Sequence, residues 1–361
     1  VLEMLPKINF KPDVIHFNDW QTGILALLLN DNYKKYNFYK DIKTLYTIHN
    51  IRYQGQFDPK IIDDVLGIDH WHWYTGNIRH NNLVNFMKAG IIYADKINTV
   101  SETYAEEIKS SYFGEGLDYA LKMRSKDLEG IVNGISYEKF NPEVDNDIYY
   151  NYSKENLEQK YKNKKKLQKE MGLPQKEDVP LVGIVTRLVE QKGLDLLTEV
   201  FEEMIENENM QFLLLGTGQK HYEDFFRQMA AKYPEKVAAK IKYDAALAQK
   251  IYAGLDIFLM PSRFEPCGLG QIISMRYGTI PLVKETGGLQ DTVEPYDEFS
   301  DSGFGFSFSH FNAHDMLYTI RRALFFYNKD DIWIKLMKRA MSKDFSWKNS
   351  AKKYINLYKS L

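Results

Sequence analysis

The chain alternates short runs of apolar, largely β-branched residues with helix-length amphipathic patterns, and it completes this alternation twice. In the first cycle an opening helix is expected over 2–5, strands over 13–17, 44–48 and 96–100, and helices over 83–93 and from Tyr104. Alternation of this kind is typical of a parallel α/β fold, because each strand is followed by a helix that returns the chain to the same edge of the sheet.

The second cycle follows a lysine-rich stretch over 154–172 that has a helical pattern. Strands are expected over 181–185, 211–215, 240–243, 257–260 and 280–283, with a helix over 194–205 and two helices after Lys329. These strands are nearly continuous apolar runs, which favours a sheet covered on both faces. The charged and tyrosine-rich residues 145–169 are interpreted as a solvated helix without an assigned function.

A length of 361 residues exceeds what a single core usually organises, so two domains are expected. No linker rich in Pro, Gly or Ser separates the cycles, and the boundary is therefore placed at a hinge over 131–142, where Asn133-Gly134 signals a turn. The predicted division is 1–130, 131–340 and a C-terminal segment, 341–361. Open α/β sheets bind ligands outside the carboxyl ends of their strands, so a cleft faced by two such sheets is the expected ligand site.

Charge and composition exclude several function classes. The formal net charge is -2, which provides no positive field for nucleic acid or an anionic membrane. No apolar run approaches the roughly 20 residues that span a bilayer, and no signal peptide is recognised at this N-terminus. The single cysteine, Cys267, excludes an internal disulfide framework and fits a reducing compartment. The 14% aromatic content suits the stacking of sugars but equally suits aromatic cores.

The segment PSRFEPCGLGQ, residues 261–271, carries the most specific chemistry. It places Glu265 between an expected strand and a helix that begins near Gly268 and Gly270. A carboxylate there can accept hydrogen bonds from sugar hydroxyls beside free backbone N–H groups. Alone, the segment could equally be a capped loop with a solvated glutamate.

The segment LVGIVTRLVEQKGL, residues 181–194, adds two cations, Arg187 and Lys192, on a strand-to-helix loop. A nucleotide-sugar donor leaves as a diphosphate, and without a bound metal cationic side chains must stabilise the growing negative charge; each such contact contributes about 1.5–3 kcal/mol. No Asp-x-Asp pair lies at a strand end in these motifs, so neither a metal nor a cofactor is predicted. The alternative is that Arg187 and Lys192 are ordinary solvated surface residues without a functional role.

Two glycine pairs and two strand-end polar residues complete the candidates. Gly216 and Gly218 form a tight turn that lacks the third glycine of a dinucleotide fingerprint, and Gly287-Gly288 opens another strand-to-helix turn. Asp19 and His49 follow strands of the first cycle, although a lone histidine is more often structural than catalytic.

Taken together, six segments resemble the bacterial glycogen synthase and plant starch synthase family over essentially the whole chain. They are HFNDWQTG, TIHNIRYQGQF, NFMKAGIIYADKINTVSETYAEEI, GIVTRLVEQKGLDLL, SRFEPCGLGQ and KETGGLQDTV, in the family's order and spacing. The resemblance implies a GT-B fold with two Rossmann-like domains, ADP-glucose as the donor, and retaining transfer of glucose to the non-reducing end of an α-1,4-glucan. It also implies a location in the cytoplasm, or in the plastid stroma of a plant-type organism.

The resemblance assigns roles residue by residue. The residues expected to act in catalysis are Glu265, Arg187, Lys192 and His49. Those expected at the donor are Cys267, Gly268, Leu269, Gly216, Gly218, Gly287, Gly288 and Asn133, and those on the glucose or acceptor side are Asp19, Asn50, Tyr53 and Gln54. The last helices are expected to pack back on the first domain.

The chain departs from the family's pattern in two places. Many relatives carry Thr where Gly270 stands, which removes one hydroxyl near the phosphates. Relatives also begin with strand–helix units and a Lys-x-Gly-Gly-Leu loop that are not found here; at about 30 residues per unit, roughly 90 or more residues are expected to be missing and the first domain to be incomplete.

Two rival functions stay open at this point. The broader GT-B glycosyltransferases usually carry two glutamates separated by seven residues, but the eighth residue after Glu265 is Ile273, which favours the glucan synthase interpretation. A fragment that binds glucan or nucleotide without turnover is the rival of another class.

Overall fold

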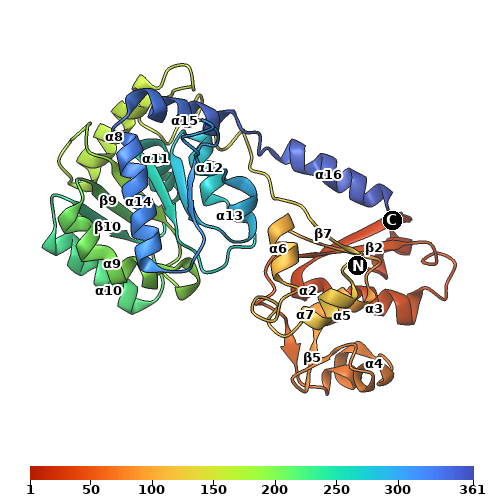
Figure 1. Cartoon of the computed structure of the whole chain (residues 1–361). Helices are drawn as coiled ribbons and strands as arrows, with labels where there is room; N and C mark the ends of the chain where they lie inside the picture. Colours follow the sequence, from red (N-terminus) through yellow and green to blue (C-terminus); the bar gives the residue numbers. More distant parts are fainter. The chain divides into compact units, whose positions relative to one another are not determined.

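The computed structural model describes residues 1–361, which form two compact units (Figure 1). Unit 1 comprises Val1–Asn133 and Ser350–Leu361, and unit 2 comprises Gly134–Asn349. The chain therefore passes from unit 1 to unit 2 and returns to unit 1 for its last residues.

Unit 1 is built on a parallel four-stranded sheet in the order β1-β2-β6-β7. Its strands are β1 (Val14–Asn18), β2 (Lys43–Ile48), β6 (Lys96–Thr99) and β7 (Leu128–Gly130). The expected strands over 13–17, 44–48 and 96–100 are confirmed to within a residue, whereas β7 was not predicted. Because β7 has only three residues, it offers too short a pattern to be recognised in the sequence.

The helices of unit 1 are short. They are α1 (Met4–Lys7), α2 (Asp19–Gly23), α3 (Leu25–Leu28), α4 (Trp71–Tyr74), α5 (Phe86–Tyr93), α6 (Glu102–Glu107) and α7 (Asp118–Met123), with π-helical turns η1 (Leu29–Tyr33) and η2 (Ile62–Leu66). The expected helix over 83–93 is wrong at its start, because 83–85 form a strand. The side chain of Asn85 accepts a hydrogen bond from the backbone N–H of Lys88 and thereby caps α5 one residue before Phe86.

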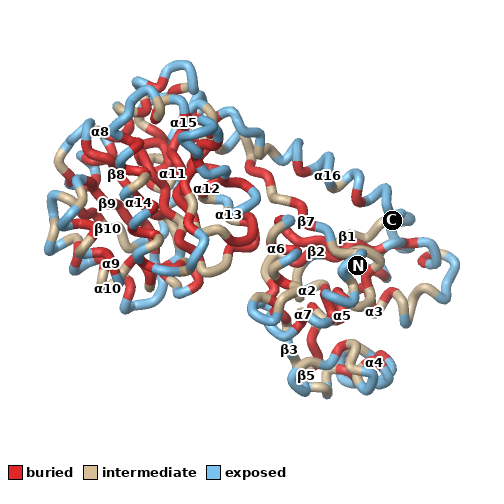
Figure 2. Tube along the Cα trace, in the orientation of Figure 1, coloured by how far each residue is buried: buried red, intermediate tan, exposed pale blue.

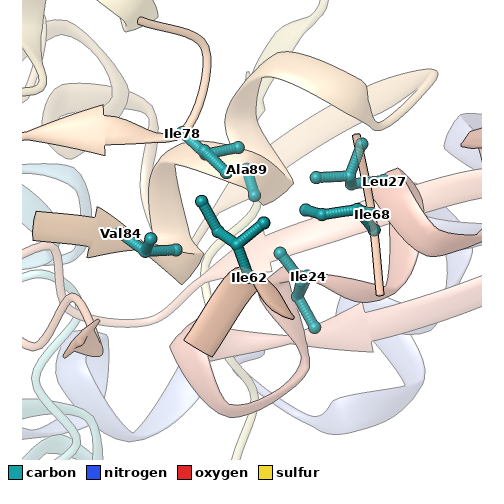
Figure 3. Packing of buried hydrophobic residues seen from close by; sticks show 7 residues of the cluster. All are labelled: Ile24, Leu27, Ile62, Ile68, Ile78, Val84 and Ala89. Atoms are coloured by element: carbon teal, nitrogen blue, oxygen red, sulfur yellow. The ribbon is translucent and has the colours of Figure 1, made fainter. Parts of the chain in front are cut away.

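Between β2 and α5 the chain forms an insert with its own small core. Its antiparallel sheet has the order β3-β5-β4 and comprises β3 (Gln56–Phe57), β4 (Arg79–His80) and β5 (Leu83–Asn85). Figure 3 shows side chains of the insert converging with those of α3 and α5; the buried members are Ile24, Leu27, Ile62, Ile68, Ile78, Val84 and Ala89. This apolar cluster fixes the insert on the helices of unit 1.

Unit 2 contains a parallel six-stranded sheet in the order β10-β9-β8-β11-β12-β13. Its strands are β8 (Leu181–Val185), β9 (Gln211–Gly216), β10 (Val237–Ile241), β11 (Ile257–Met260), β12 (Ile280–Lys284) and β13 (Phe306–Phe308). The expected central strands are confirmed, and their nearly continuous burial, clear in Figure 2, agrees with helices on both faces. The strand expected over 240–243 is wrong in its bounds. The observed strand, β10, ends at Ile241, so Lys242 and Tyr243 belong to the following loop.

The helices of unit 2 surround this sheet. They are α8 (Glu158–Met171), α9 (Leu194–Asn207), α10 (Lys220–Lys232), α11 (Ala245–Gly254), α12 (Gly270–Arg276), α13 (Gly287–Thr292), α14 (Ala313–Tyr327) and α15 (Asp330–Ser342), with the 3₁₀ turn η3 (Glu190–Lys192). Parallel crossovers are right-handed, and strand order reverses direction between β10 and β11. The crossover helices α9 and α10 therefore lie on one face and α11 and α12 on the other.

The expectation of a solvated helix over 145–169 is wrong in two respects. The helix begins only at Glu158, and one of its faces is buried. Lys160 and Lys164 are 2% and 1% exposed. The Nζ atom of Lys164 lies 2.7 Å from Asp256 Oδ2, and this buried partner is what allows a charged residue to face the core.

The final helix, α16 (Trp347–Lys359), begins in unit 2 and ends in unit 1. Its apolar contacts in unit 1 join Leu357 to Leu45 and Ile131. None of the helices in the structure is both long and apolar enough to cross a membrane.

Candidate functional site

The carboxyl edge of the unit 2 sheet brings the strand-end loops together. Every strand of this sheet is parallel to its neighbours, so the loops that follow β8, β9, β10, β11 and β12 all leave from the same edge. From β8 the chain adds β9 and β10 on one side of the sheet, and from β11 it adds β12 and β13 on the other side. The boundary between β8 and β11 is therefore the topological switch point. In doubly wound sheets this position forms the ligand crevice.

Lys192 and Glu265 meet at this switch point. The Nζ atom of Lys192 donates a hydrogen bond to Glu265 Oε2 at 2.6 Å, and Ser262 Oγ donates to the same oxygen at 3.0 Å. The Lys192 and Glu265 side chains are only 15% and 9% exposed. Both printed contacts are made by Oε2 of this largely buried carboxylate, one of them a charge-assisted hydrogen bond.

The two loops can approach because glycine occupies the contact. Gly193, directly after Lys192, has φ +68°, and a Cβ atom there would lie 1.8 Å from the carbonyl oxygen of Pro261. A side chain at this position would therefore force the Lys192 loop away from the end of β11. The backbone N–H of Arg263 donates to Gln191 O at 3.0 Å and closes the same contact.

The paired glycines at the start of α13 pack against the Glu265 loop in the same way. A Cβ atom on Gly287 would lie 2.1 Å from Glu265 O, and one on Gly288 would lie 2.1 Å from Cys267 O. The backbone N–H of Gly288 donates to Glu265 O at 3.1 Å. Because neither glycine has a side chain, the start of α13 lies directly against the Glu265 loop and holds it in place.

The remaining residues of the Glu265 loop differ in exposure. Cys267 is 5% exposed, whereas Leu269 is 45% exposed. Gly268 has φ +72°, a left-handed conformation that favours glycine. At Gly270 an added Cβ atom would lie 2.8 Å from the ring of Phe258, so this ring occupies the room that a side chain would need.

Arg187 lines a separate cavity of about 340 Å³ at the same edge. Its walls are Lys139, Phe140, Val185, Thr186, Arg187, Leu215, Gly216, Thr217, Lys242, Tyr243, Asp244, Ala245, Ala248, Gln249, Tyr252 and Ile273. Neither Lys192 nor Glu265 is among them, so the structure brings Lys192 and Glu265 together but does not put Arg187 in direct contact with that pair. The Arg187 side chain is exposed, so an anion can reach it.

The sequence analysis did not predict that Lys242, Tyr243 and Asp244 line this cavity, because it placed Lys242 and Tyr243 inside a strand. Since β10 ends at Ile241, Tyr243 is released into the loop and is 87% exposed. The signal that could have found it is Asp244, a helix-capping residue type. Its side chain accepts from Leu247 N at 2.9 Å and so marks the start of α11.

The second glycine of the Gly216 turn has a structural role in addition to any contact with a ligand. Gly218 donates its backbone N–H to Glu223 Oε1 at 3.0 Å, and a Cβ atom there would lie 2.3 Å from Leu188 O. The turn after β9 is therefore held against the loop that carries Arg187.

In unit 1, Asp19 and His49 lie together at the carboxyl ends of the adjacent strands β1 and β2. The backbone N–H of His49 donates to Asp19 Oδ1 at 2.9 Å, and His49 Nε2 donates to Asn18 Oδ1 at 2.9 Å. The bond to Asn18 places the ring proton on Nε2 and leaves Nδ1 as an acceptor. Asp19 has φ +56°, an uncommon conformation for a residue with a side chain. The sequence did not single out Asn18.

The other residues expected on the acceptor side have different surroundings. Tyr53 is 51% exposed, and Asn50 Oδ1 accepts from the backbone of Arg52 at 3.0 Å. Gln54 is 7% exposed; its Nε2 donates to Glu115 O at 3.0 Å and its Oε1 accepts from Asn85 at 2.6 Å. In this structure the Gln54 side chain therefore braces the insert. Asn133 is partly buried and is the last residue before the chain passes into unit 2.

A buried polar network lies next to His49. The Thr47 hydroxyl donates its hydrogen to Asn98 Oδ1, so Thr47 Oγ1 accepts the hydrogen bond from His16 Nε2. The other ring nitrogen of His16, Nδ1, accepts from Tyr358 OH at 2.8 Å. Burial, and to a smaller extent the charge of nearby His49, lowers the pKa of His16 to about 4. A neutral His16 is what this pattern of donors and acceptors requires.

The site thus offers chemistry suited to a polar, partly anionic ligand. Unit 2 combines a buried ammonium–carboxylate pair with a cavity walled by a cation and an exposed tyrosine ring. An ammonium group at such an edge can stabilise negative charge that develops on a departing group, and a carboxylate can accept hydroxyl protons.

Comparison with known proteins identifies relatives of both halves of the chain. Residues 1–123 match the family model for the starch synthase catalytic domain. Residues 164–336 match the model for glycosyl transferases group 1.

The individual relatives are consistent with these matches. The chain is 51% identical to a glycogen synthase of Clostridium novyi and 52% identical to one of Geobacillus thermodenitrificans, in both cases over 100% of this chain and over 75% and 74% of the relative. A solved structure, the catalytic domain of starch synthase IV from Arabidopsis thaliana bound to ADP and acarbose, matches with a TM-score of 0.90 at 36% identity. That match covers 99% of this chain and 75% of the other.

Proposed function

The chain belongs to the glycogen synthase and starch synthase family and is a GT-B glucosyltransferase of glycogen or starch synthesis, and from this premise we propose how it works and on which substrates. The proposed donor is ADP-glucose, and the proposed acceptor is the non-reducing end of an α-1,4-glucan. The ADP in the Arabidopsis structure supports this choice of nucleotide. A cytoplasmic location, or the plastid stroma in a plant-type organism, is part of the same proposal.

The Lys192–Glu265 pair is the observation that carries the proposal. In our mechanism the bond between C1 of glucose and the diphosphate oxygen breaks first, and positive charge develops on the sugar while negative charge develops on the diphosphate. Lys192 and Arg187 would stabilise the diphosphate, and Glu265 would hold the glucose hydroxyls. Charges that are positioned in advance favour this state over the ground state.

The acceptor 4-hydroxyl then forms the new bond to C1 on the face that the diphosphate leaves, which retains the configuration. Its proton passes to a diphosphate oxygen, and ADP is released. Asp19 and His49 of unit 1 would contact the glucose or acceptor. A double displacement would need a nucleophile on the opposite face, and His49, the residue expected there, lies with a ring nitrogen bonded to Asn18.

The cavity that Arg187 lines is the proposed site of the nucleotide base. Its volume of about 340 Å³ accommodates a purine, and the 87% exposed ring of Tyr243 offers a face for stacking. Gly216, at the end of β9, lines this cavity, and a Cβ atom there would lie 2.0 Å from Thr186 O, so glycine lets β9 lie close to the loop that carries Arg187.

The proposal is tested by following ADP release with both substrates present and with each omitted. Release should require both ADP-glucose and glycogen, and UDP-glucose should be the poorer donor. Calorimetric titration of ADP separates the two candidate functions. ADP binding without any glucan-dependent ADP release would identify a non-catalytic binding protein and overturn the proposed turnover.

A further inference from the structure

Arg263 lies in the loop that follows β11, two residues before Glu265, and its side chain reaches the segment that carries Lys192. Its Nη2 atom donates a hydrogen bond to Asp195 Oδ2 at 2.8 Å and lies 3.6 Å from Glu190 Oε1. These two carboxylates stand on either side of Lys192, because Glu190 begins the turn η3 and Asp195 lies in the first turn of α9. One guanidinium group therefore contacts both ends of the segment that presents Lys192.

The backbone of the same loop makes two further contacts with this segment. The N–H group of Arg263 donates to Gln191 O at 3.0 Å, and Gln191 Nε2 donates to Phe264 O at 3.3 Å. Gln191 is 6% exposed and directly precedes Lys192. Residues 263–264 thus contact residues 190, 191 and 195, which surround Lys192 in the sequence.

An aromatic ring fixes the guanidinium plane. The Cζ atom of Arg263 lies 4.1 Å from the centroid of the ring of Phe311, a residue of the loop before α14. A planar guanidinium that stacks on a ring keeps the N–H groups at its edge directed at acceptors, which the ammonium group of a lysine does not do. The ring of Phe311 therefore helps to hold Arg263 in the orientation in which it binds the carboxylates.

The ion pairs of Arg263 are too exposed to contribute much to the free energy of unfolding. The side chains of Arg263 and Asp195 are 33% and 37% exposed, and that of Glu190 is 70% exposed. These contacts instead fix a geometry, because Lys192 and Glu265 belong to different loops and their charged atoms lie 2.6 Å apart. A shift of about 1 Å in a group that acts on the reacting bond is enough to slow a reaction severely.

We propose that Arg263 is a positioning residue that joins the segment around Lys192 to the Glu265 loop and so directs the Lys192 ammonium group at the departing diphosphate. The inference rests on the proposed roles of Lys192 and Glu265 in glucose transfer. Arg263 touches no substrate in this role. Its effect on the rate passes through Lys192 and should therefore be largely absent from a variant that lacks the Lys192 ammonium group.

The test is a double-variant cycle with Lys192→Gln, measured as initial rates of ADP release at saturating glycogen. Arg263→Ala alone should lower kcat about tenfold and change KM for ADP-glucose less than about threefold, because a displaced Lys192 weakens the transition state more than it weakens the bound donor. In the Lys192→Gln background the same substitution should lower kcat less than about twofold. Asp195→Ala, which removes the acceptor and keeps Arg263, should give the same two results.

The matched control is Arg321→Ala. Arg321 is 43% exposed and binds Glu203 and Glu208 at the other end of α9, so this variant loses the same kind of contacts far along the helix from Lys192. It should unfold at about the same temperature as Arg263→Ala and keep the wild-type rate.

Wild-type kcat in both Arg263→Ala and Asp195→Ala would overturn the role proposed for Arg263. An equal loss of rate in the two backgrounds would also overturn it, because Arg263 would then act independently of Lys192. Near-normal turnover by Lys192→Gln would remove the proposed function of Lys192 and the role of Arg263 together. Slow turnover by Lys192→Gln beside normal turnover by Arg263→Ala would remove the role of Arg263 alone.

Discussion

Lys192 and Glu265 are separated by 73 residues in sequence, yet their charged atoms lie 2.6 Å apart at a sheet edge. The two side chains are largely withdrawn from water, at 15% and 9% exposed, and they form an ion pair with each other. Two lysines of α8, Lys160 and Lys164, are buried more deeply, but both bond within the fold. Burial of an ionisable side chain by itself therefore does not mark function; the position of Lys192 and Glu265 at the carboxyl edge of the sheet is what separates them from the α8 lysines.

Replacing Lys192 by Gln or Glu265 by Ala should each lower turnover at least about hundredfold, equivalent to about 2.7 kcal/mol. The reason is that, in the proposed mechanism, either change removes a charge that stabilises the breaking bond. Initial rates of ADP release measure the effect, and calorimetric ADP binding checks that unit 2 is intact. The control is Lys220→Gln, because Lys220 is an 85% exposed lysine paired with Asp224. Near-normal rates in the Lys192 or Glu265 variant would remove the assigned role.

Lys160 should make stability depend on pH. Burial lowers its pKa from 10.5 to about 7, with Asp256 opposing the shift and Lys164 adding to it. The amine donates to Ala253 O and Thr279 Oγ1, two acceptors for the two protons of its neutral form. Between about pH 7 and 10.5 the unfolded chain binds the extra proton, so this group makes the free energy of unfolding increase with pH, by at most about 1.4 kcal/mol per pH unit.

Chemical denaturation across this pH range, in wild type and in Lys160→Met, isolates the contribution of Lys160. The difference in the free energy of unfolding between the two proteins should change with pH in this window. A difference that is constant from pH 7 to 10 would show that Lys160 keeps an ordinary pKa.

At the scale of elements, glycines rather than long side chains set the distance between the Lys192 turn η3, the end of β11 and the start of α13. Gly193, Gly287 and Gly288 each bring backbone against backbone, and this close packing positions the Glu265 loop. Close packing of this kind holds the loops in place, which is what a site holding charges in advance requires.

Gly193→Ala should therefore lower the free energy of unfolding by more than the strain of an alanine at positive φ accounts for. Gly172, which ends α8 with φ +79° and has no atom within 4 Å of an added Cβ, is the matched control. Gly172→Ala should lose about 1 kcal/mol of stability with unchanged activity. Gly193→Ala should lose more stability and at least about tenfold in rate, because the Lys192 turn must move. Equal effects of the two substitutions would contradict the close-packing argument.

At the scale of the whole molecule, Ser350–Leu361 belong to unit 1, although the chain between them and the rest of that unit forms unit 2. Tyr358 and Tyr354 bond His16 and Asn98 of the unit 1 sheet, and Ser350 Oγ bonds Val132 O at 2.8 Å. These contacts of unit 1 can therefore form only after Gly134–Asn349 have been synthesised.

Replacing Tyr354 and Tyr358 together by Phe should lower the stability of unit 1 by about 1–3 kcal/mol, because the bonds to half-buried His16 and buried Asn98 are lost. Scanning calorimetry should show the transition of unit 1 at a lower temperature. The transition of unit 2, identified by its shift on addition of ADP, should stay in place. Tyr318→Phe, at a 69% exposed position of α14, is the control. An unchanged unit 1 transition would show that α16 contributes little to that unit.

Much of the fold could be predicted from the sequence because it is encoded locally. Buried strands such as β2, β8 and β11 are largely apolar runs, and their ends place His49, Arg187 and Glu265 in loops without knowledge of the rest of the molecule. The order of the motifs is likewise a property of the chain alone. Very short strands such as β7 and β13 escaped because three residues carry no periodicity, and β10 was shifted because its apolar pattern continues into the loop.

The sequence by itself determined the parallel α/β class, the strand ends and the family resemblance, since all of these depend on neighbouring residues. Only the tertiary structure decided that Lys192 pairs with Glu265, that Lys160 and Lys164 face the core, and that Tyr243 enters the cavity wall. Each of these depends on which distant backbone lies within a few ångströms. That distance is set by packing across the whole unit and leaves no trace in the spacing of residues along the chain.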